Sequence, residues 1–193
     1  MPTGTVAAVF ATLDEARDVA STCTRCELSE GRANVVFGIG SPACEVMFIG
    51  EGPGAEEDRL GVPFVGRSGQ LLDRLVTEEM GLSRDEIAIC NTVKCRPPGN
   101  RDPKPTEIEA CKPFLDAQIT HIDPLVIVTL GNFAARLLLD TKTGITKLRG
   151  TEYPFRDRVL VPTFHPAAAL RGGGVVLAQL RADLVRAKLV LAR

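Results

Sequence analysis

The chain has 193 residues, of which 45% are hydrophobic and 24% charged, and its formal net charge is −1. This length suits a single compact domain, which we expect to extend over residues 1–193, and no apolar run suggests a membrane span. The overall charge argues against a surface coated with basic residues for nucleic acid. The charge is unevenly spread, however, with a net −8 in residues 1–93 and a net +7 in residues 94–193. The second half therefore has the charge for a basic face that binds a polyanion.

The N-terminal stretch, residues 1–20, has no basic segment ahead of its apolar part. We therefore expect no signal peptide and a cytoplasmic location. The six cysteines would then meet a reducing environment, in which disulfides are rare.

Four of the cysteines form two spaced pairs. Cys23 and Cys26 make a C-x2-C pair, and Cys95 and Cys111 make a C-x15-C pair. Two such pairs can chelate one centre, although the spacing differs from that of a zinc ribbon, whose second pair is also close. From the spacing alone, an iron-sulfur cluster, a zinc ion and no metal all remain open.

The first half of the chain predicts two helices on either side of a strand. Residues 13–20 favour a short helix, and the apolar residues 46–49 favour a buried strand that leads into a loop of glycine and proline. A second helix is expected from Ser68, which can cap it, to Gly81, which can end it.

The second half alternates strands and helices. Strands are predicted over residues 87–93, 125–130 and 158–164, and helices over 106–121, capped by Thr106, 133–139 and 175–190. This alternation predicts an α/β fold with a mainly parallel, four-stranded sheet. Ligands bind outside the carboxyl ends of such strands. We therefore expect the loop after residue 49, Asn91 with the basic loop that follows it, and His165 to converge on one crevice.

The loop that begins at residue 50 carries the strongest signs of a site. Gly50, Gly52 and Gly54 allow close approach of a ligand to the backbone, and Phe64 lies in a segment rich in glycine and proline. Its ring either stacks on a flat ligand or closes the core beneath the loop, and residue type alone favours the core. Residues 50–55 also match the G-x-G-x-x-A dinucleotide fingerprint. We expect no helix before about residue 68, however, and the acidic run at residues 56–58 opposes a pyrophosphate.

Two polar residues follow predicted strands. His165, held by Pro166, can donate a hydrogen bond to an oxygen that gains charge, although a structural role is the commoner one for a single histidine. Asn91 offers a donor and an acceptor together, which suits the edge of a base, yet Asn is equally common in turns.

Several ordered motifs together resemble the iron-sulfur uracil-DNA glycosylases of family 4. They are GEGPGAEED with PFVGRSGQLL, then NTVKCRPPGNR, LGNFAA, ITKLRG and HPAAALR, and they extend over nearly the whole chain. The resemblance implies a three-layer α/β/α sandwich around a short sheet and the hydrolytic removal of uracil from DNA. It also implies a [4Fe-4S] cluster in a subregion built from residues 23–26 and 95–111, with Cys23, Cys26, Cys95 and Cys111 as ligands.

The resemblance also implies roles for the residues of the crevice. Phe64 would stack on an extruded uracil, and Asn91 would read its polar edge. His165 would donate to the uracil carbonyl oxygen as the base leaves, and Glu51 would position water or stabilise the cationic sugar. Glu57 would crowd the position of the thymine methyl group. Gly52, in the same loop, stands where the glycosylases with a G-Q-D-P-Y motif have an aspartate, so the group that activates water remains open.

The expected contacts to DNA lie in the second half of the chain. The segment 168–171 resembles a loop that wedges into the duplex, with Leu170 and Arg171 as contacts. Phosphate contacts that would make binding sensitive to salt are expected from basic side chains, namely Lys94, Arg96, Arg101, Lys147 and Arg149.

The partner implied by the resemblance is uracil-containing DNA, double- or single-stranded, bound by a monomer that uses no nicotinamide or flavin cofactor. A second hypothesis is a non-catalytic iron-sulfur module for DNA binding or electron transfer. Such a module needs the four cysteines but neither Asn91 nor His165.

Overall fold

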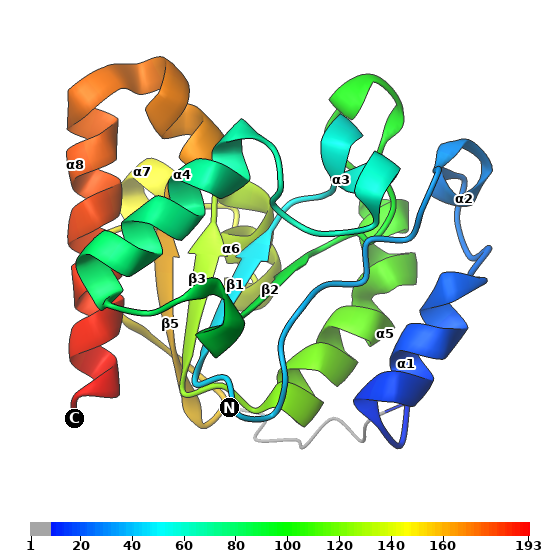
Figure 1. The fold of residues 1–193 in the computed structure, drawn as a ribbon, viewed down its shortest axis with the longest axis horizontal. Coiled ribbons are helices and arrows are strands. Elements are labelled where there is room, and N and C mark those ends of the chain that lie inside the picture. Colours follow the sequence, from blue (N-terminus) through cyan, green and yellow to red (C-terminus); the bar gives the residue numbers. More distant parts are fainter. Residues whose placement is uncertain (1–8) are drawn as a thin grey trace.

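A mainly parallel sheet of five strands forms the centre of the computed structural model, which describes residues 9–193 (Figure 1). The expectation about a signal peptide depends partly on residues 1–8, which lie outside the described residues. The strands are β1 (Val46–Gly50), β2 (Ile87–Asn91), β3 (Val126–Leu130), β4 (Tyr153–Phe155) and β5 (Arg158–Thr163). Their order across the sheet is β2-β1-β3-β5-β4.

Helices cover both faces of the sheet and give the predicted three layers (Figure 1). On one face lie α4 (Arg67–Leu75), the π-helical turn η1 (Val76–Met80) and α8 (Pro166–Leu191); on the other lie α5 (Pro105–Ile122) and α6 (Asn132–Leu139). Alternate residues of a strand point to opposite faces, so Val46 and Phe48 pack on the first layer and Met47 and Ile49 on the second. Every residue of β1, β2 and β3 is buried, as expected for strands covered on both sides.

The predicted sheet of four strands lacked one edge strand. The four parallel strands are present, but β4 pairs antiparallel with β5 through the register Tyr153 to Leu160 and Phe155 to Arg158. This strand has three residues with Pro154 at its centre, a composition that carries no clear strand signal. An edge strand tolerates proline because one of its sides needs no hydrogen-bond donor.

Three helix starts differ from the expected ones. The short helix α3 (Ala55–Leu60) opens where we expected no helix, because Gly61 ends it in the left-handed conformation instead of preventing it. The N-cap of α4 is Gly66 and not Ser68, and α5 begins at Pro105 with Lys104 as its cap in place of Thr106. Because a helix does begin at residue 55, its expected absence no longer argues against a dinucleotide site. The acidic first turn of α3 still does.

The last helix also begins earlier than predicted. It starts at Pro166, directly after His165, and Gly173 interrupts it with a φ of 71°. Residues 168–171, expected to form a loop, therefore lie in the helical segment before this kink. The remaining short elements are η2 (Arg84–Glu86), η3 (Pro98–Asn100) and α7 (Ile145–Leu148).

A separate apolar cluster joins the N-terminal helices to the main domain. The predicted helix at residues 13–20 is present as α1 (Leu13–Ser21), which packs against α5, and α2 (Leu28–Gly31) follows it. Phe10 stacks on Phe114 of α5 with ring centroids 5.4 Å apart. Leu28, Phe37 and the cysteine side chains of this region complete the cluster. Among residues 9–193, none of the helices has the length and apolar character needed to cross a bilayer.

Lys94 ties this cluster to the carboxyl end of β2. Its side chain is buried, and its ammonium group donates to the carbonyl oxygen of Asn91 (2.7 Å) and to Oε1 of Gln118. Gln118 in turn donates to the carbonyl oxygen of Phe37 at 2.7 Å. A buried lysine is retained only where polar partners compensate the loss of water, and these acceptors supply that compensation.

We expect Lys94→Met to lower the stability of the protein by about 2 kcal/mol, because it leaves two buried acceptors without their donor. For a chain of this size the loss corresponds to a fall in Tm of about 4–8 °C, measured by circular dichroism. Lys142→Met, at an exposed position, is the matched control. Equal Tm values for the two variants would contradict the structural role of the ammonium group.

Candidate active site

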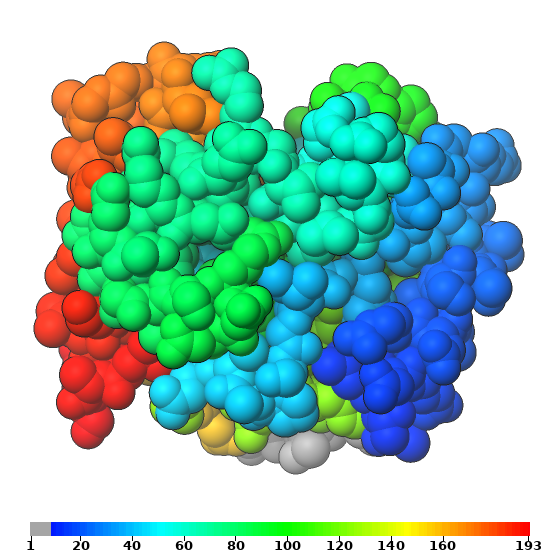
Figure 2. Space-filling view, in the orientation of Figure 1, coloured from blue at the N-terminus to red at the C-terminus, as the bar shows by residue number. Residues whose placement is uncertain are grey.

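A cavity of about 590 Å³ opens at the carboxyl edge of the parallel strands. In Figure 2 the surface is hollowed at the top of the view, between the teal and orange segments that begin α4 and α8 and the cyan and green segments of α3 and η3. Its lining combines the loop after β1, the end of β2 and the start of α8, with Glu51, Gly52, Phe64, Asn91 and His165 among its residues. The structure thus confirms the predicted convergence of three segments, and the volume lies in the range of pockets that bind small molecules.

Asn91 ends β2 at the floor of this cavity. The residue is buried, and among the described residues its Oδ1 atom has no hydrogen-bond partner. A Cβ atom on the neighbouring Gly50 would lie 2.4 Å from that oxygen and 2.7 Å from the Phe64 ring. Only glycine therefore leaves room at this position for the amide and the ring together. An unpaired buried acceptor is costly without a ligand that donates to it.

Phe64 forms one wall of the cavity. Its side chain is buried, and its ring centroid lies 5.5 Å from that of His165. Its backbone has a φ of 51°, the left-handed region that bulky residues rarely adopt. Such strain persists only where the surroundings hold it. The two interpretations of the sequence are therefore not exclusive, since the ring is buried and also lines the cavity.

His165 is the N-cap of α8, and its Nδ1 atom accepts a hydrogen bond from the backbone N–H of Ala167 at 3.1 Å. Burial lowers the pKa of the imidazole from 6.5 to about 4; Arg171 also lowers it, and Glu57 opposes the shift. The ring is thus neutral near pH 7, and because Nδ1 is an acceptor, the proton is on Nε2. His165 is a neutral donor in the wall of the cavity.

Glu51 lies at the start of the loop after β1. Burial and, to a smaller extent, the charge of Asp102 raise the pKa of its carboxyl group from 4.5 to about 7. The two residues after β2 fix its backbone, because its carbonyl oxygen accepts hydrogen bonds from the hydroxyl of Thr92 and the N–H of Val93. A carboxyl group that changes its charge near pH 7 is suited to proton or charge chemistry.

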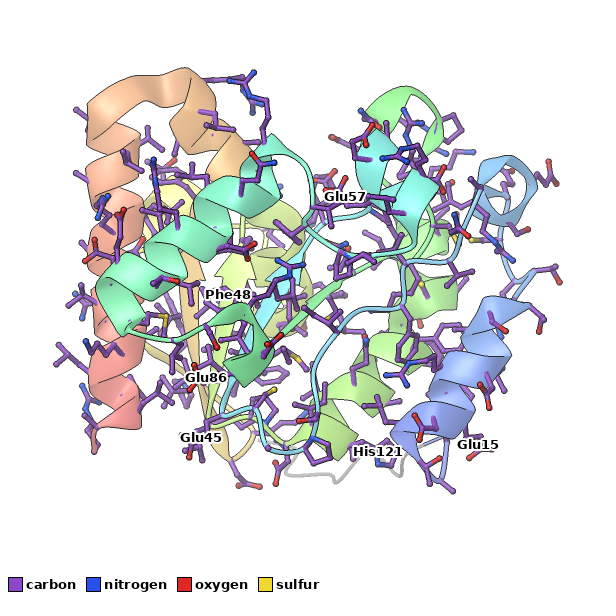
Figure 3. The ribbon with its side chains drawn as sticks, in the orientation of Figure 1. Glu15, Glu45, Phe48, Glu57, Glu86 and His121 are labelled. Atoms are coloured by element: carbon purple, nitrogen blue, oxygen red, sulfur yellow. The ribbon has the colours of Figure 1, made fainter. Side chains whose placement is uncertain are left out.

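The acidic side chains after Glu51 accept hydrogen bonds from backbone N–H groups of neighbouring segments, and some of them also line the cavity. Oε1 of Glu57 accepts hydrogen bonds from the N–H groups of Val65 and Gly66, each at 2.9 Å. Glu57 reaches from α3 to the loop that follows it, as Figure 3 shows. Asp58 accepts from the N–H of Ala33 at 3.0 Å and so ties α3 to the segment after α2. Glu57 also lines the cavity, so its expected role towards thymine stays a prediction.

Two of the five expected phosphate contacts are unsuited to that role. Lys94 is 1% exposed and its ammonium group is bonded inside the protein, and Arg149 is paired with the buried Asp183 through Nε (2.9 Å) and Nη2 (2.7 Å). Burial contradicts the contact expected of Lys94, and the ion pair with Asp183 counts against that expected of Arg149, because sequence gives the charge of a side chain but not its surroundings. Arg101 lines the cavity while paired with Glu107, and Lys147 is exposed.

The expected duplex contacts lie at the rim of the cavity. Leu170 is 44% exposed, and Arg171 is exposed beside it. Arg171 lines the main cavity, and Leu170 lines a second one with residues of α4, including Arg67 and Arg74. Arg67 lines both cavities and was not singled out from the sequence, in which it is one arginine among many.

The four paired cysteines lie together at the other side of the β2 loop. Cys23, Cys26, Cys95 and Cys111 line one small cavity. The backbone N–H of Lys94 lies 3.3 Å from Sγ of Cys111, and burial raises the pKa of that thiol to about 11, while Lys94 lowers it in part. Among residues 9–193, no group of three or more His, Cys, Asp or Glu side chains is close enough to hold a single metal ion. A set of four thiols around one cavity fits an iron-sulfur cluster, in which each iron takes one thiolate.

One contributor to the site escaped notice in the sequence. Arg84 donates to the backbone carbonyl oxygens of Pro63 and Phe64, twenty residues earlier in the chain. No local pattern marks such a contact, because it depends on η2 packing beside the loop.

Together these features define an α/β/α protein with a pocket of mixed polar and apolar lining at the carboxyl edge of its sheet. The family model of the uracil DNA glycosylase superfamily matches residues 37–184. The chain is 45% identical to a type-4 uracil-DNA glycosylase of Sulfurisphaera tokodaii over 82% of the chain and 76% of that protein. It is 50% identical to a type-4 uracil-DNA glycosylase of Thermotoga maritima, over 77% of the chain and 78% of that protein.

The chain therefore belongs to the uracil DNA glycosylase superfamily. The family resemblance and the α/β/α sandwich read from the sequence are both confirmed.

We expect Glu51→Gln to stabilise the protein at neutral and basic pH. The folded state holds the Glu51 proton up to a pKa of about 7 against 4.5 when unfolded, so this group lowers stability as pH rises between those values. The Tm of the variant should equal that of the parent near pH 4.5 and exceed it by a few degrees near pH 8. Glu109→Gln, at an exposed position of α5, is the control. A Tm difference that does not change with pH would contradict the raised pKa.

Proposed function

We propose that the protein is a uracil-DNA glycosylase of type 4 that excises uracil from DNA and leaves an abasic site. The single observation that carries this proposal is the unpaired Oδ1 atom of Asn91, buried beside the Phe64 ring in the cavity that His165 also lines. A planar base with an N–H group and carbonyl oxygens complements this set of groups. The similarity to two type-4 uracil-DNA glycosylases supports the same conclusion.

The reaction begins when the uracil nucleotide leaves the base stack of the duplex, at a cost of a few kcal/mol. Phe64 offers its ring as a stacking surface, which is worth about 1–3 kcal/mol per base in single-strand binding proteins. Oδ1 of Asn91 accepts from an N–H of the base, and the amide group donates to the adjacent carbonyl oxygen. Leu170 and Arg171 at the rim are suited to occupy the gap left in the duplex.

Cleavage of the glycosidic bond places negative charge on the base and positive charge on the sugar. Nε2–H of His165 donates to the carbonyl oxygen that gains charge, and its neutral state means that the donor is present at the outset. The Glu51 carboxylate faces the cationic sugar or positions the water that attacks it. The base leaves with the bonding electron pair, water supplies the hydroxyl group that replaces it, and the remaining proton of that water neutralises the departing base.

We assign Cys23, Cys26, Cys95 and Cys111 to a [4Fe-4S] cluster. When bound, the cluster would supply covalent cross-links between residues 23–26 and 95–111. The second hypothesis, a non-catalytic iron-sulfur module, has no use for the pocket around Asn91. We further propose a single cytoplasmic domain that acts as a monomer without a nicotinamide or flavin cofactor.

The activity is tested with a labelled oligonucleotide that carries one uracil, with EDTA present, followed by alkali to cleave abasic sites. We expect cleavage at uracil and none in the matching thymine oligonucleotide. His165→Ala should lower the single-turnover rate by about 10²–10³-fold, the loss usual for one preorganised donor.

Asn91→Ala should also lower the rate, through the loss of base recognition, and Lys142→Ala should match the parent. The iron-sulfur absorbance at about 400 nm shows that each protein carries its cluster. A cluster-bearing parent protein that leaves uracil intact would refute the proposed function in favour of the non-catalytic module.

We expect kcat/KM for uracil excision to rise with pH through a pKa near 7, because the Glu51 carboxylate is the active form. A second limb belongs to His165, whose pKa of about 4 places its loss of activity at lower pH. The Glu51→Gln variant should have a lower kcat/KM, and its kcat/KM should no longer rise with pH near 7. An unchanged limb in that variant would assign it to another group.

A further inference from the structure

We propose that Arg84 and Glu57 form a clamp that fixes the backbone of Phe64 so that its ring stands ready to stack on the extruded base. The term Phe64 clamp is used for these two side chains together. This inference rests on the proposed function and deepens it. It makes Arg84 a positioning residue for base capture, although Arg84 is not among the residues that line the cavity.

The conformation of Phe64 needs such a device. Its φ of 51° places a bulky residue in a region that L-amino acids avoid, because Cβ comes close to the neighbouring carbonyl oxygen. A glycine would adopt this φ without strain, but the residue here is phenylalanine. The segment would relax to an extended conformation unless groups around it held its peptide units in place.

Arg84 holds the carbonyl side of this segment. Its Nη1 atom donates to the carbonyl oxygen of Phe64 at 3.3 Å, and its Nη2 atom donates to that of Pro63. Asp73 of α4 accepts from Nη1 at 2.6 Å and so orients the guanidinium group. The rigid fork of an arginine can bond two successive carbonyl oxygens at once, which a lysine cannot do in the same geometry.

Glu57 holds the other side. Its Oε1 atom accepts from the N–H groups of Val65 and Gly66 at 2.9 Å. Arg84 of η2 therefore fixes the peptide group before Phe64, and Arg84 and Glu57 of α3, with opposite charges, together fix the one after it. Hydrogen bonds to charged groups are shorter and stronger than those between neutral groups.

Two glycines allow the clamp to close. A Cβ atom on Gly69 of α4 would lie 1.8 Å from the Phe64 carbonyl oxygen, and one on Gly50 would lie 2.7 Å from the ring. The backbone of Phe64 thus packs against α4 while its ring packs over the end of β1. Both approaches are open only to residues without a side chain.

The consequence is a ring that is ordered before the base arrives. Binding then avoids the entropic cost of ordering that loop, which would otherwise be taken from the affinity for the base. The clamp concerns the base alone, because contacts to the DNA backbone come from other segments. Loss of the clamp should therefore weaken binding of a nucleotide that has a base and spare one that lacks it.

The test compares Arg84→Met with the parent on two duplexes, both with the cluster-loaded full chain. One carries 2′-fluoro-2′-deoxyuridine, which resists cleavage of the glycosidic bond, and the other carries a tetrahydrofuran abasic analogue. We expect the Kd for the first duplex to rise about five- to tenfold, less than the loss of a whole stacking contact. The Kd for the second should stay within twofold. Arg59→Met, which removes an exposed arginine of α3, should leave both unchanged.

A double-mutant cycle with Phe64→Ala separates positioning from general destabilisation. If Arg84 acts through the ring, Arg84→Met should change the Kd for the fluorouridine duplex less than twofold once Phe64 is alanine. In uracil excision, KM should rise more than kcat falls, and Arg84→Lys should recover part of the loss. Should Arg84→Met not fold, Glu57→Leu in the same cycle tests the clamp from its other side.

An equal loss of affinity for both duplexes, or an unchanged effect of Arg84→Met in the Phe64→Ala background, would overturn the clamp. These outcomes differ from failure of the proposed function, in which the parent protein itself leaves uracil in place. A parent that excises uracil while Arg84→Met matches it in every respect refutes the clamp alone.

Discussion

The pocket at Asn91 and the group of four cysteines both depend on the hydrogen bonds of the buried Lys94. Its ammonium group bonds the carbonyl oxygen of Asn91 on one side and Gln118 of α5 on the other, and the backbone N–H of the same residue points at Cys111. Among residues 9–193 it forms no ion pair with a carboxylate. A buried cation without a carboxylate is stable where buried acceptors replace the lost water, and the oxygens of Asn91 and Gln118 do so. The base pocket and the cysteine cluster are thus joined through one residue.

The position of the pocket follows from the polarity of the parallel strands. Because β1, β2 and β5 run in the same direction, the segments after Gly50, Asn91 and Thr163 emerge at one edge of the sheet. The strand ends bring groups together that lie more than a hundred residues apart. What the sheet does not provide is the path of the loop after β1, which depends on Glu57 and on contacts from η2.

The sequence allowed a mainly parallel sheet with convergent strand ends to be predicted, but not the burial of single side chains. Convergence of Asn91 and His165 could be predicted because it depends only on strand polarity and on chain order. Lys94 was misassigned because a basic loop looks alike whether its side chains point inward or outward. The strand at Tyr153 was missed for a different reason, since it exists through its pairing with β5 and not through its own composition.

The electrostatics of the pocket favour charge separation without proton transfer from His165. Burial and Arg171 keep the imidazole neutral, so the pocket presents an N–H donor whose hydrogen bond strengthens as the uracil oxygen gains charge. Protonation of the ring would instead place a charge in a desolvated wall and would release the hydrogen bond from Ala167 that orients it. The cationic sugar meets the opposite arrangement, because Glu51 carries its charge only above its raised pKa. The two groups that the proposed reaction uses therefore have their pKa values moved in opposite directions, that of His165 downward and that of Glu51 upward.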